Sequence, residues 1–250
     1  MRRVRLCRLG LFVVAVGILE VLCLTGVIDN LTMPPPHRMV VDLARMLISG
    51  SLDKAIAKTM ANAGIALALS IVVGIAAAVV IHGVRMLRDG LDPLFATYYA
   101  VPVFAFYPLF IVLFGLGDVP EILIAFMLAV VAVIVNTLDG LDRVPLVLMK
   151  AARINRLSPI ETAWQVTLPC AAPYLLTGVK MAVAYALIGI IGAEFIMSSG
   201  GMGYEISFAY TGFDNATMYP LILLILLVSI SINTALARWE KRLLARRGLA

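Results

Sequence analysis

The chain of 250 residues is far more apolar than a water-soluble protein. Apolar residues make up 62% of it, charged residues only 14%, and the mean hydropathy is +1.01. About a quarter of the residues of a soluble domain are charged, so this composition excludes one and indicates an all-α integral membrane protein. The net charge of +5 comes largely from arginines near the chain ends and between apolar segments. Such charges report membrane orientation and do not indicate a nucleic-acid partner.

The apolar segments predict six membrane-spanning helices, each of about 20 residues. They are residues 9–28, 60–81, 94–116, 122–138, 171–197 and 218–237. The basic start of the chain resembles a secretory signal, but Glu20 interrupts the apolar run and no clean cleavage site follows. We therefore expect an uncleaved first span.

These spans divide the chain into three parts. Residues 1–28 would form the cytoplasmic N-terminus and the first span, and residues 29–59 an extracytoplasmic amphipathic segment. Within this segment, an amphipathic helix should follow Met33 and three prolines. Residues 60–250 would form the core transmembrane domain, which includes a polar cytoplasmic loop at residues 139–170.

The distribution of lysine and arginine predicts that both termini are cytoplasmic. The segments assigned to the cytoplasm carry Arg2, Arg3, Arg5, Arg8, Arg85, Arg88, Arg143, Lys150, Arg153, Arg156, Arg238, Lys241, Arg242, Arg246 and Arg247. The later outside loops, residues 117–121 and 198–217, carry no lysine or arginine. Only residues 29–59 break the trend, with Arg38, Arg45, Lys54 and Lys58.

The polar stretch at residues 150–169 lies between two long apolar runs and must face water. Ser158, Pro159 and Glu161 have the spacing of a capping box, which predicts that a short helix begins at Pro159. We expect this helix to end before Pro169, because proline does not continue a helix. A second, alanine-rich helical piece should end near Arg153, with a polar turn at residues 155–157 between the two.

Three charged side chains lie inside the expected spans. Because such charges are costly in lipid, Glu20, Lys180 and Glu194 should face protein or water. Glu194 is the leading candidate for a substrate pathway; the alternative is an interfacial carboxylate that binds water or neighbouring backbone. We expect Lys180 to extend towards the inner interface and Glu20 to make an interfacial or helix contact.

The third span carries two further candidates for the pathway. Tyr98 and Pro102 lie in a segment that also contains Pro108, and these prolines predict a kinked helix. The freed backbone carbonyls of such a helix need partners, a feature that is common near transport pathways.

The sequence shows no catalytic or cofactor motif. Cys7, Cys23 and Cys170 form no C-x-x-C pair, and His37 and His82 are isolated on opposite sides of the membrane. Neither a metal site nor a disulfide framework is indicated. The glycines at residues 200–203 lack the strand and helix that surround a phosphate-binding loop. We therefore expect no enzyme activity, no cofactor and no ATP hydrolysis by this chain.

The polar stretch resembles the EAA loop of ATP-binding-cassette importer permeases. That loop reads E-A-A, three residues, Gly, nine residues and then I-x-L-P. Ala151 and Ala152 match the alanines, and Val166, Leu168 and Pro169 match the end of the pattern, with valine for isoleucine.

Further segments are similar to the permeases that import nitrate, sulfonates and taurine, and the resemblance covers most of the chain from about residue 34. The matching segments are Leu91-Asp92-Pro93, Val101-Pro102, Tyr107-Pro108-Leu109, Phe114-Gly115-Leu116-Gly117, residues 175–180, Ala193-Glu194 and Gly201-Met202-Gly203-Tyr204.

Two residues depart from the pattern: Lys150 stands in place of the leading glutamate and Arg156 in place of the glycine. The glycine would allow a sharp turn, which arginine adopts only at a cost. We expect Asn155 to take the left-handed conformation instead. The lysine changes the charge that the loop presents to an ATPase.

The resemblance implies a bundle of six spans with the ABC type I importer permease fold, in a bacterial cytoplasmic (inner) membrane. It implies a homodimer, two cytoplasmic ATPase subunits, an extracytoplasmic solute-binding protein and a small anionic substrate such as a sulfonate, taurine or nitrate. Transport would proceed by alternating access. The residues assigned to the ATPase-coupling loop are Lys150, Ala151, Ala152, Asn155, Arg156, Ser158, Glu161, Val166, Leu168 and Pro169.

Two other classes of protein remain as alternatives. A self-sufficient ion-coupled carrier would show inverted repeats with broken helices at the membrane centre, and no convincing internal repeat is present. An intramembrane enzyme would need a paired nucleophile and base, which the sequence does not show.

Overall fold

A computed structural model describes residues 2–29 and 32–246, and all the regular secondary structure of these residues is helical. Arg247 of the basic C-terminal set and residues 30–31 of the 29–59 segment lie outside the described residues. The α-helices are α1 Arg2–Leu24, α2 Pro36–Ile48, α3 Asp53–Gly83, α4 Arg85–Thr97, α5 Tyr107–Phe114, α6 Asp118–Asp142, α7 Leu146–Ile154, α8 Pro159–Thr162, α9 Leu168–Met197, α10 Met202–Thr211 and α11 Asn215–Arg246. Two 3₁₀ turns, Tyr98–Ala100 and Val103–Phe106, connect α4 to α5, and a π-helical turn, Ala163–Thr167, connects α8 to α9.

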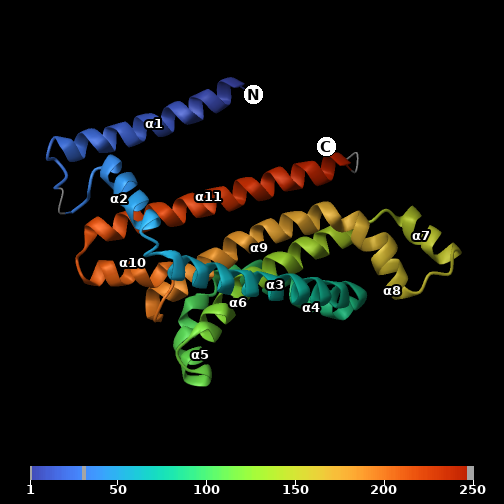
Figure 1. The fold of residues 1–250 in the computed structure, drawn as a ribbon. Coiled ribbons are helices and arrows are strands. Elements are labelled where there is room, and N and C mark those ends of the chain that lie inside the picture. Colours follow the sequence, from blue (N-terminus) through green and yellow to red (C-terminus); the bar gives the residue numbers. More distant parts are fainter. Residues whose placement is uncertain (1, 30–31, 247–250) are drawn as a thin grey trace.

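The centre of the molecule is formed by α3, α6 and α9, which pack side by side along most of their length (Figure 1). Small residues allow their backbones to approach closely. A Cβ atom at Gly189 of α9 would lie 2.5 Å from Cα of Ala125 in α6, and one at Gly178 would lie 2.9 Å from Cβ of Asn136. Residues larger than glycine would therefore push α6 and α9 apart.

A second apolar cluster joins α2, α10 and α11. Leu43 of α2, Ile206 of α10 and Leu224 of α11 are buried in it. The amphipathic helix predicted after the three prolines is therefore present as α2, and it packs against the ends of later helices. Lys54 and Lys58, which were assigned to the same segment, belong instead to the start of α3.

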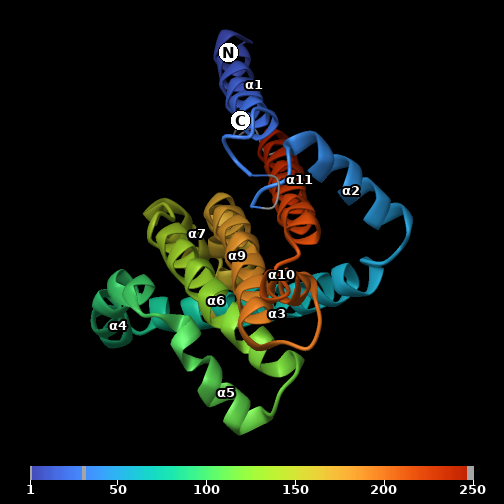
Figure 2. The same cartoon turned by 90° about the vertical axis from the view of Figure 1, so that its left-hand side faces the viewer.

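Helix α1 stands apart from the central helices, and α5 projects away from them on the opposite side (Figure 2). Most described side chains of α1 are exposed; Leu11, for example, is 76% exposed. The contact of α1 with the rest of the fold includes Glu20, whose carboxylate accepts from the backbone N–H of His37 in α2 at 3.2 Å and also contacts the ring of that histidine. Glu20 thus makes the helix contact that we expected.

The six-span prediction is not confirmed. Four described helices are long and apolar enough to cross a membrane, or five if the bent pair of residues 85–114 counts as one span. The apolar part of α1, Gly10–Leu24, is shorter. The expected third span is not a single kinked helix: its two halves meet at 89°.

The start of α1 and the end of α11 point towards the end of the molecule that carries α4, α7 and α8, whereas α2 and α10 lie at the other end (Figure 1). This places the segments assigned to each side of the membrane at opposite ends. Which end faces the cytoplasm stays a prediction from the arginine distribution.

Candidate functional site

The loop at residues 139–170 projects from one end of the central helices as two short helices, α7 and α8 (Figure 1). The predicted capping box at the start of α8 is confirmed. The backbone N–H of Ser158 donates to Oε2 of Glu161 at 2.8 Å, and the N–H of Glu161 donates to Oγ of Ser158 at 3.3 Å. These two bonds satisfy backbone donors that the first helical turn cannot pair.

The prediction that this helix ends before Pro169 is wrong. From Pro159 the chain runs through the π turn directly into α9, and residues 159–196 form one long candidate span. Pro169 lies in the first turn of α9, where its missing N–H costs little. The wider π turn accommodates the change, with Oγ1 of Thr167 donating to the carbonyl of Thr162 at 2.9 Å.

The turn between α7 and α8 also differs from the prediction. Arg156, and not Asn155, adopts the left-handed conformation, with φ of 52°. The N–H of Leu157 donates to the carbonyl of Ala152 at 3.1 Å, and that of Arg156 donates to the carbonyl of Arg153 at 3.0 Å. This pair of bonds is a Schellman motif, whose left-handed position is usually glycine. The motif explains why the family pattern has glycine where this chain has Arg156.

The loop residues divide into an exposed and an inward set. Ala152 is only 3% exposed, so its side chain is not part of the outer surface of the loop. Val166 and Leu168 are half-buried. The exposed members are Lys150, Ala151, Asn155, Arg156, Ser158, Glu161 and Pro169.

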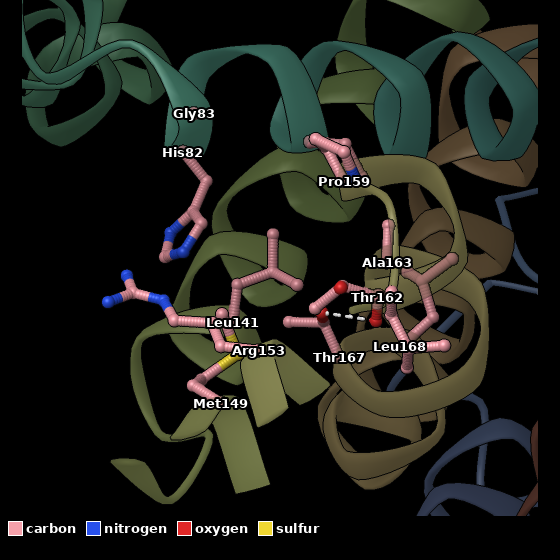
Figure 3. A pocket seen from close by; sticks show the side chains of 12 residues that line it. His82, Gly83, Leu141, Met149, Arg153, Pro159, Thr162, Ala163, Thr167 and Leu168 are labelled. Carbon is pink, nitrogen blue, oxygen red and sulfur yellow. Dashed lines mark hydrogen bonds between the residues drawn. The ribbon is translucent and has the colours of Figure 1, made fainter. Parts of the chain in front are cut away.

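A cavity of about 460 Å³ lies between the loop and the ends of α3 and α6. His82 and Arg153 are on one side of it, and Thr162, Thr167 and Leu168 are on the other (Figure 3). The cavity lining is mostly apolar. The ring of His82 is also 3.1 Å from a carboxylate oxygen of Asp142.

At the opposite end, a polar cluster joins α3, α6 and the segment after α9. Nζ of Lys58 lies 3.1 Å from Oδ1 of Asp118 and 3.3 Å from Oε1 of Glu121. Asn62 donates to both carboxylates at 3.1 Å, and Ser198 donates to Glu121 at 2.6 Å. The carboxylate of Glu121 is fully buried, so these partners offset its desolvation.

Glu194 is also fully buried and anchors the start of α10. Its carboxylate accepts from Oγ1 of Thr59 at 2.8 Å and from the backbone N–H of Gly203 at 2.9 Å. Thr59 in turn accepts from the N–H of Met202 at 2.8 Å. The N–H groups of Met202 and Gly203, which begin α10 and have no partner within the helix, are therefore satisfied by Thr59 and Glu194. The N-terminus of the helix also interacts favourably with a carboxylate.

The three pathway candidates differ in burial and in their contacts. Glu194 is buried, Tyr98 is half-buried with its hydroxyl donating to the carbonyl of Met127 at 2.9 Å, and Pro102 is exposed. Next to Tyr98, the ring of Tyr99 stacks on Tyr185 of α9, with centroids 5.2 Å apart. The aromatic pair links the bent segment to α9.

Lys180 has a direct partner in the fold, and its expected extension towards the inner interface stays a prediction. Its Nζ lies 2.8 Å from Oε2 of Glu240, so the pair joins α9 to α11. Neither the polar cluster nor this pair can be predicted from local sequence, and the reason is the same for both. Each consists of charges on separate helices, and the only sequence signal was the charged residues at or near the ends of apolar runs.

In the described part of the chain, no three His, Cys, Asp or Glu side chains come together in a group that could hold a metal ion.

The family model described as "Binding-protein-dependent transport system inner membrane component" matches residues 70–247, well over half of the chain. Several curated proteins are similar. A nitrate import permease, NrtB of Synechococcus elongatus, is 30% identical over 64% of this chain and 58% of its own length. A bicarbonate transport system permease, CmpB of Synechocystis, is 30% identical over 78% of this chain and 75% of its own length.

The taurine permease TauC of Escherichia coli is 25% identical over 86% of this chain and 80% of its own length. The match to a second nitrate permease, from Leptolyngbya laminosa, spans 64% of that protein, so the chain spans less than two thirds of the two nitrate permeases.

The fold is also found among solved structures. A chain of the MetNI methionine ABC transporter in an inward-facing conformation has a TM-score of 0.63 at 18% identity and covers 75% of this chain and 94% of its own length. This likeness shows the type I ABC importer permease fold. Together with the family match over residues 70–247, it shows that the chain belongs to the inner-membrane components of binding-protein-dependent transport systems, the permeases of ABC importers.

Proposed function

We propose that this chain is the membrane-spanning permease subunit of an ABC importer that moves a small anion of the sulfonate, taurine or nitrate type into the cell. The family match over residues 70–247 carries the proposal. Relatives named for nitrate, taurine and aliphatic sulfonate transport favour a small anion. Covalent chemistry is left to the partner ATPase, and the permease changes conformation.

The 139–170 loop is the proposed contact with two cytoplasmic ATPase subunits. Its two short helices stand clear of the bundle and expose Lys150, Ala151 and Asn155. An ATPase that binds this loop differently in its nucleotide-loaded and empty states would shift the permease between inward-open and outward-open states. A second copy of the chain would complete the pathway, and an extracytoplasmic solute-binding protein would deliver the substrate at the end that carries α10.

Reconstitution tests the proposal. The permease, its ATPase and its receptor are placed in liposomes, and uptake of labelled taurine, nitrate and an alkanesulfonate is measured with and without ATP on the ATPase side. We expect uptake that needs both ATP and receptor. Uptake driven by an ion gradient without ATP would instead identify a secondary carrier.

We also propose that Glu194, Tyr98 and Pro102 contribute to the pathway. Because the Glu194 carboxylate is fully buried, this role requires a second conformation that uncovers it. Glu194→Gln keeps the side-chain volume and removes the charge, so a changed uptake rate with unchanged ATPase binding would support the pathway role. Normal uptake with reduced thermal stability would assign Glu194 only to anchoring α10.

A further inference from the structure

The exposed face of α7 and the turn that follows it carries three cations. Lys150, Arg153 and Arg156 are all exposed, and none of them takes part in an ion pair within the described parts of the chain. Glu161 is the one acidic residue between positions 144 and 192. Its carboxylate accepts from the backbone N–H of Ser158 in the capping box, and among the described residues it forms no ion pair with the three cations, which outnumber it.

Several other cations at the same end of the molecule have partners within the fold. Arg88 is paired with Asp92 and Asp142 at 3.1 and 2.9 Å, and Lys180 is paired with Glu240. The guanidinium of Arg143 lies 5.1 Å from the centre of the Tyr174 ring. The cations of the α7 turn thus remain available to a partner.

Apolar side chains lie among these cations. Val147 is 74% exposed and Ile154 is 82% exposed, and both belong to α7. Exposed apolar anchors with arginine beside them are typical of protein interfaces. A solvated loop would need no such side chains.

The cavity behind α7 adds a recess to this face. Arg153 lies on one side of it, and its walls include Leu141, Met149 and Leu157. A partner segment with an acidic side chain and an apolar neighbour would meet both the guanidinium and the apolar wall (Figure 3).

We propose that the ATPase subunit that drives this permease receives the loop in a groove lined by Asp and Glu side chains, which face Lys150, Arg153 and Arg156. The inference rests on the proposed function and goes beyond it by stating the charge of the partner. Complementary charge would make the pairing specific and speed association, and it would be screened by salt.

The test uses the full-length permease in nanodiscs and its purified ATPase. Affinity is measured at low and high salt for the parent, Lys150→Glu and Arg153→Glu. We expect each reversal to weaken binding about tenfold at low salt and less at high salt. Lys54→Glu and Arg38→Glu are matched controls, because both residues are exposed at the opposite end of the molecule, and they should leave the affinity unchanged.

A carbodiimide, which joins an amine directly to a carboxylate, gives a second readout. We expect Lys150 to become linked to an Asp or Glu of the ATPase, and Lys54 not to. Binding that is insensitive to salt and to both reversals would overturn the inference while leaving the proposed function intact. Failure of the parent permease to bind any ATPase would overturn the proposed function itself. If the reversals weaken binding only in nanodiscs of anionic lipid and not in neutral ones, the cations face the membrane surface and the inference is wrong.

Discussion

Glu194 requires glycine at positions 201 and 203, where the chain enters α10. A Cβ atom at Gly201 or Gly203 would overlap the Glu194 side chain, and the Gly203 position is also crowded by the carbonyl of Ile191. Gly201 additionally has φ of 105°, which side chains disfavour. The two glycines thus allow the first turn of α10 to pack against the buried carboxylate of Glu194. The hydroxyl of Thr59 joins that carboxylate to the backbone N–H of Met202.

Removal of the Thr59 hydroxyl should destabilise this anchor. In Thr59→Val, the N–H of Met202 loses its acceptor and Glu194 loses a donor, and each is buried. An unsatisfied buried polar group costs about 1–3 kcal/mol, so we expect a clear drop in the unfolding temperature of the purified protein. Thr59→Ser retains the hydroxyl and should unfold near the parental temperature. Equal unfolding temperatures for the valine variant and the parent would contradict the anchoring role.

Arg156 occupies a left-handed position at which glycine is favoured. Arg156→Gly and Arg156→Ala remove the same charge, but only glycine adopts φ of 52° without steric cost. We expect the glycine variant to be more stable than the alanine variant by about 1 kcal/mol, measured as the free energy of local opening of residues 146–162 by hydrogen exchange. Comparing the two variants with each other separates the backbone effect from the loss of charge. If the two variants were equally stable, the left-handed conformation at position 156 would carry no steric cost for a residue other than glycine.

At the scale of helices, the sequence predicted which elements exist better than it predicted where they end. The capping box at Ser158 and Glu161 gave the correct start of α8 because both bonds are local. The boundary at Pro169 was wrong because a π turn and the position of that proline in a first helical turn remove the usual penalty. Helices α3 and α6 begin before their apolar runs, and the charges in these early turns are paired with each other, Lys58 with Glu121 at 3.3 Å. Hydropathy cannot show such a long-range pair.

The two alanines of α7 should respond differently to enlargement. Ala151 is exposed, whereas Ala152 is 3% exposed. Ala151→Trp should leave the loop folded and weaken ATPase binding by steric overlap, whereas Ala152→Trp should disrupt the packing of the loop itself, at a cost of about 1–3 kcal/mol. Limited proteolysis of the loop and ATPase binding are measured for both variants. We expect rapid cleavage only for Ala152→Trp. Full ATPase binding by Ala151→Trp would show that this face is not part of the contact.

At the scale of the whole molecule, composition and the spacing of apolar runs predicted an all-helical membrane protein. They did not predict the 89° bend at residues 98–106 or the exposed position of α1. The bend follows from prolines and 3₁₀ turns whose angle is set by packing against α6 and α9. Glu194 was a pathway candidate because of its charge within an apolar run, whereas Tyr98 and Pro102 were candidates because of the predicted kink. A charge within an apolar run does not by itself separate a buried anchor such as Glu194 from a side chain that lines a pathway.

The two ends of the molecule give a test of orientation. In a variant without Cys7, Cys23 and Cys170, single cysteines replace Phe213 and Ile154, which are 89% and 82% exposed. Phe213 follows α10, and Ile154 ends α7 at the opposite end of the bundle. Since the basic segments should be cytoplasmic, a membrane-impermeant maleimide should label Phe213→Cys in intact cells and Ile154→Cys only after permeabilisation. Cysteine at Lys54, at the α2–α3 junction, should behave like the Phe213 variant, although its surroundings are basic. Labelling of Ile154→Cys in intact cells would reverse the assigned orientation, and with it the side from which an ATPase could reach the loop.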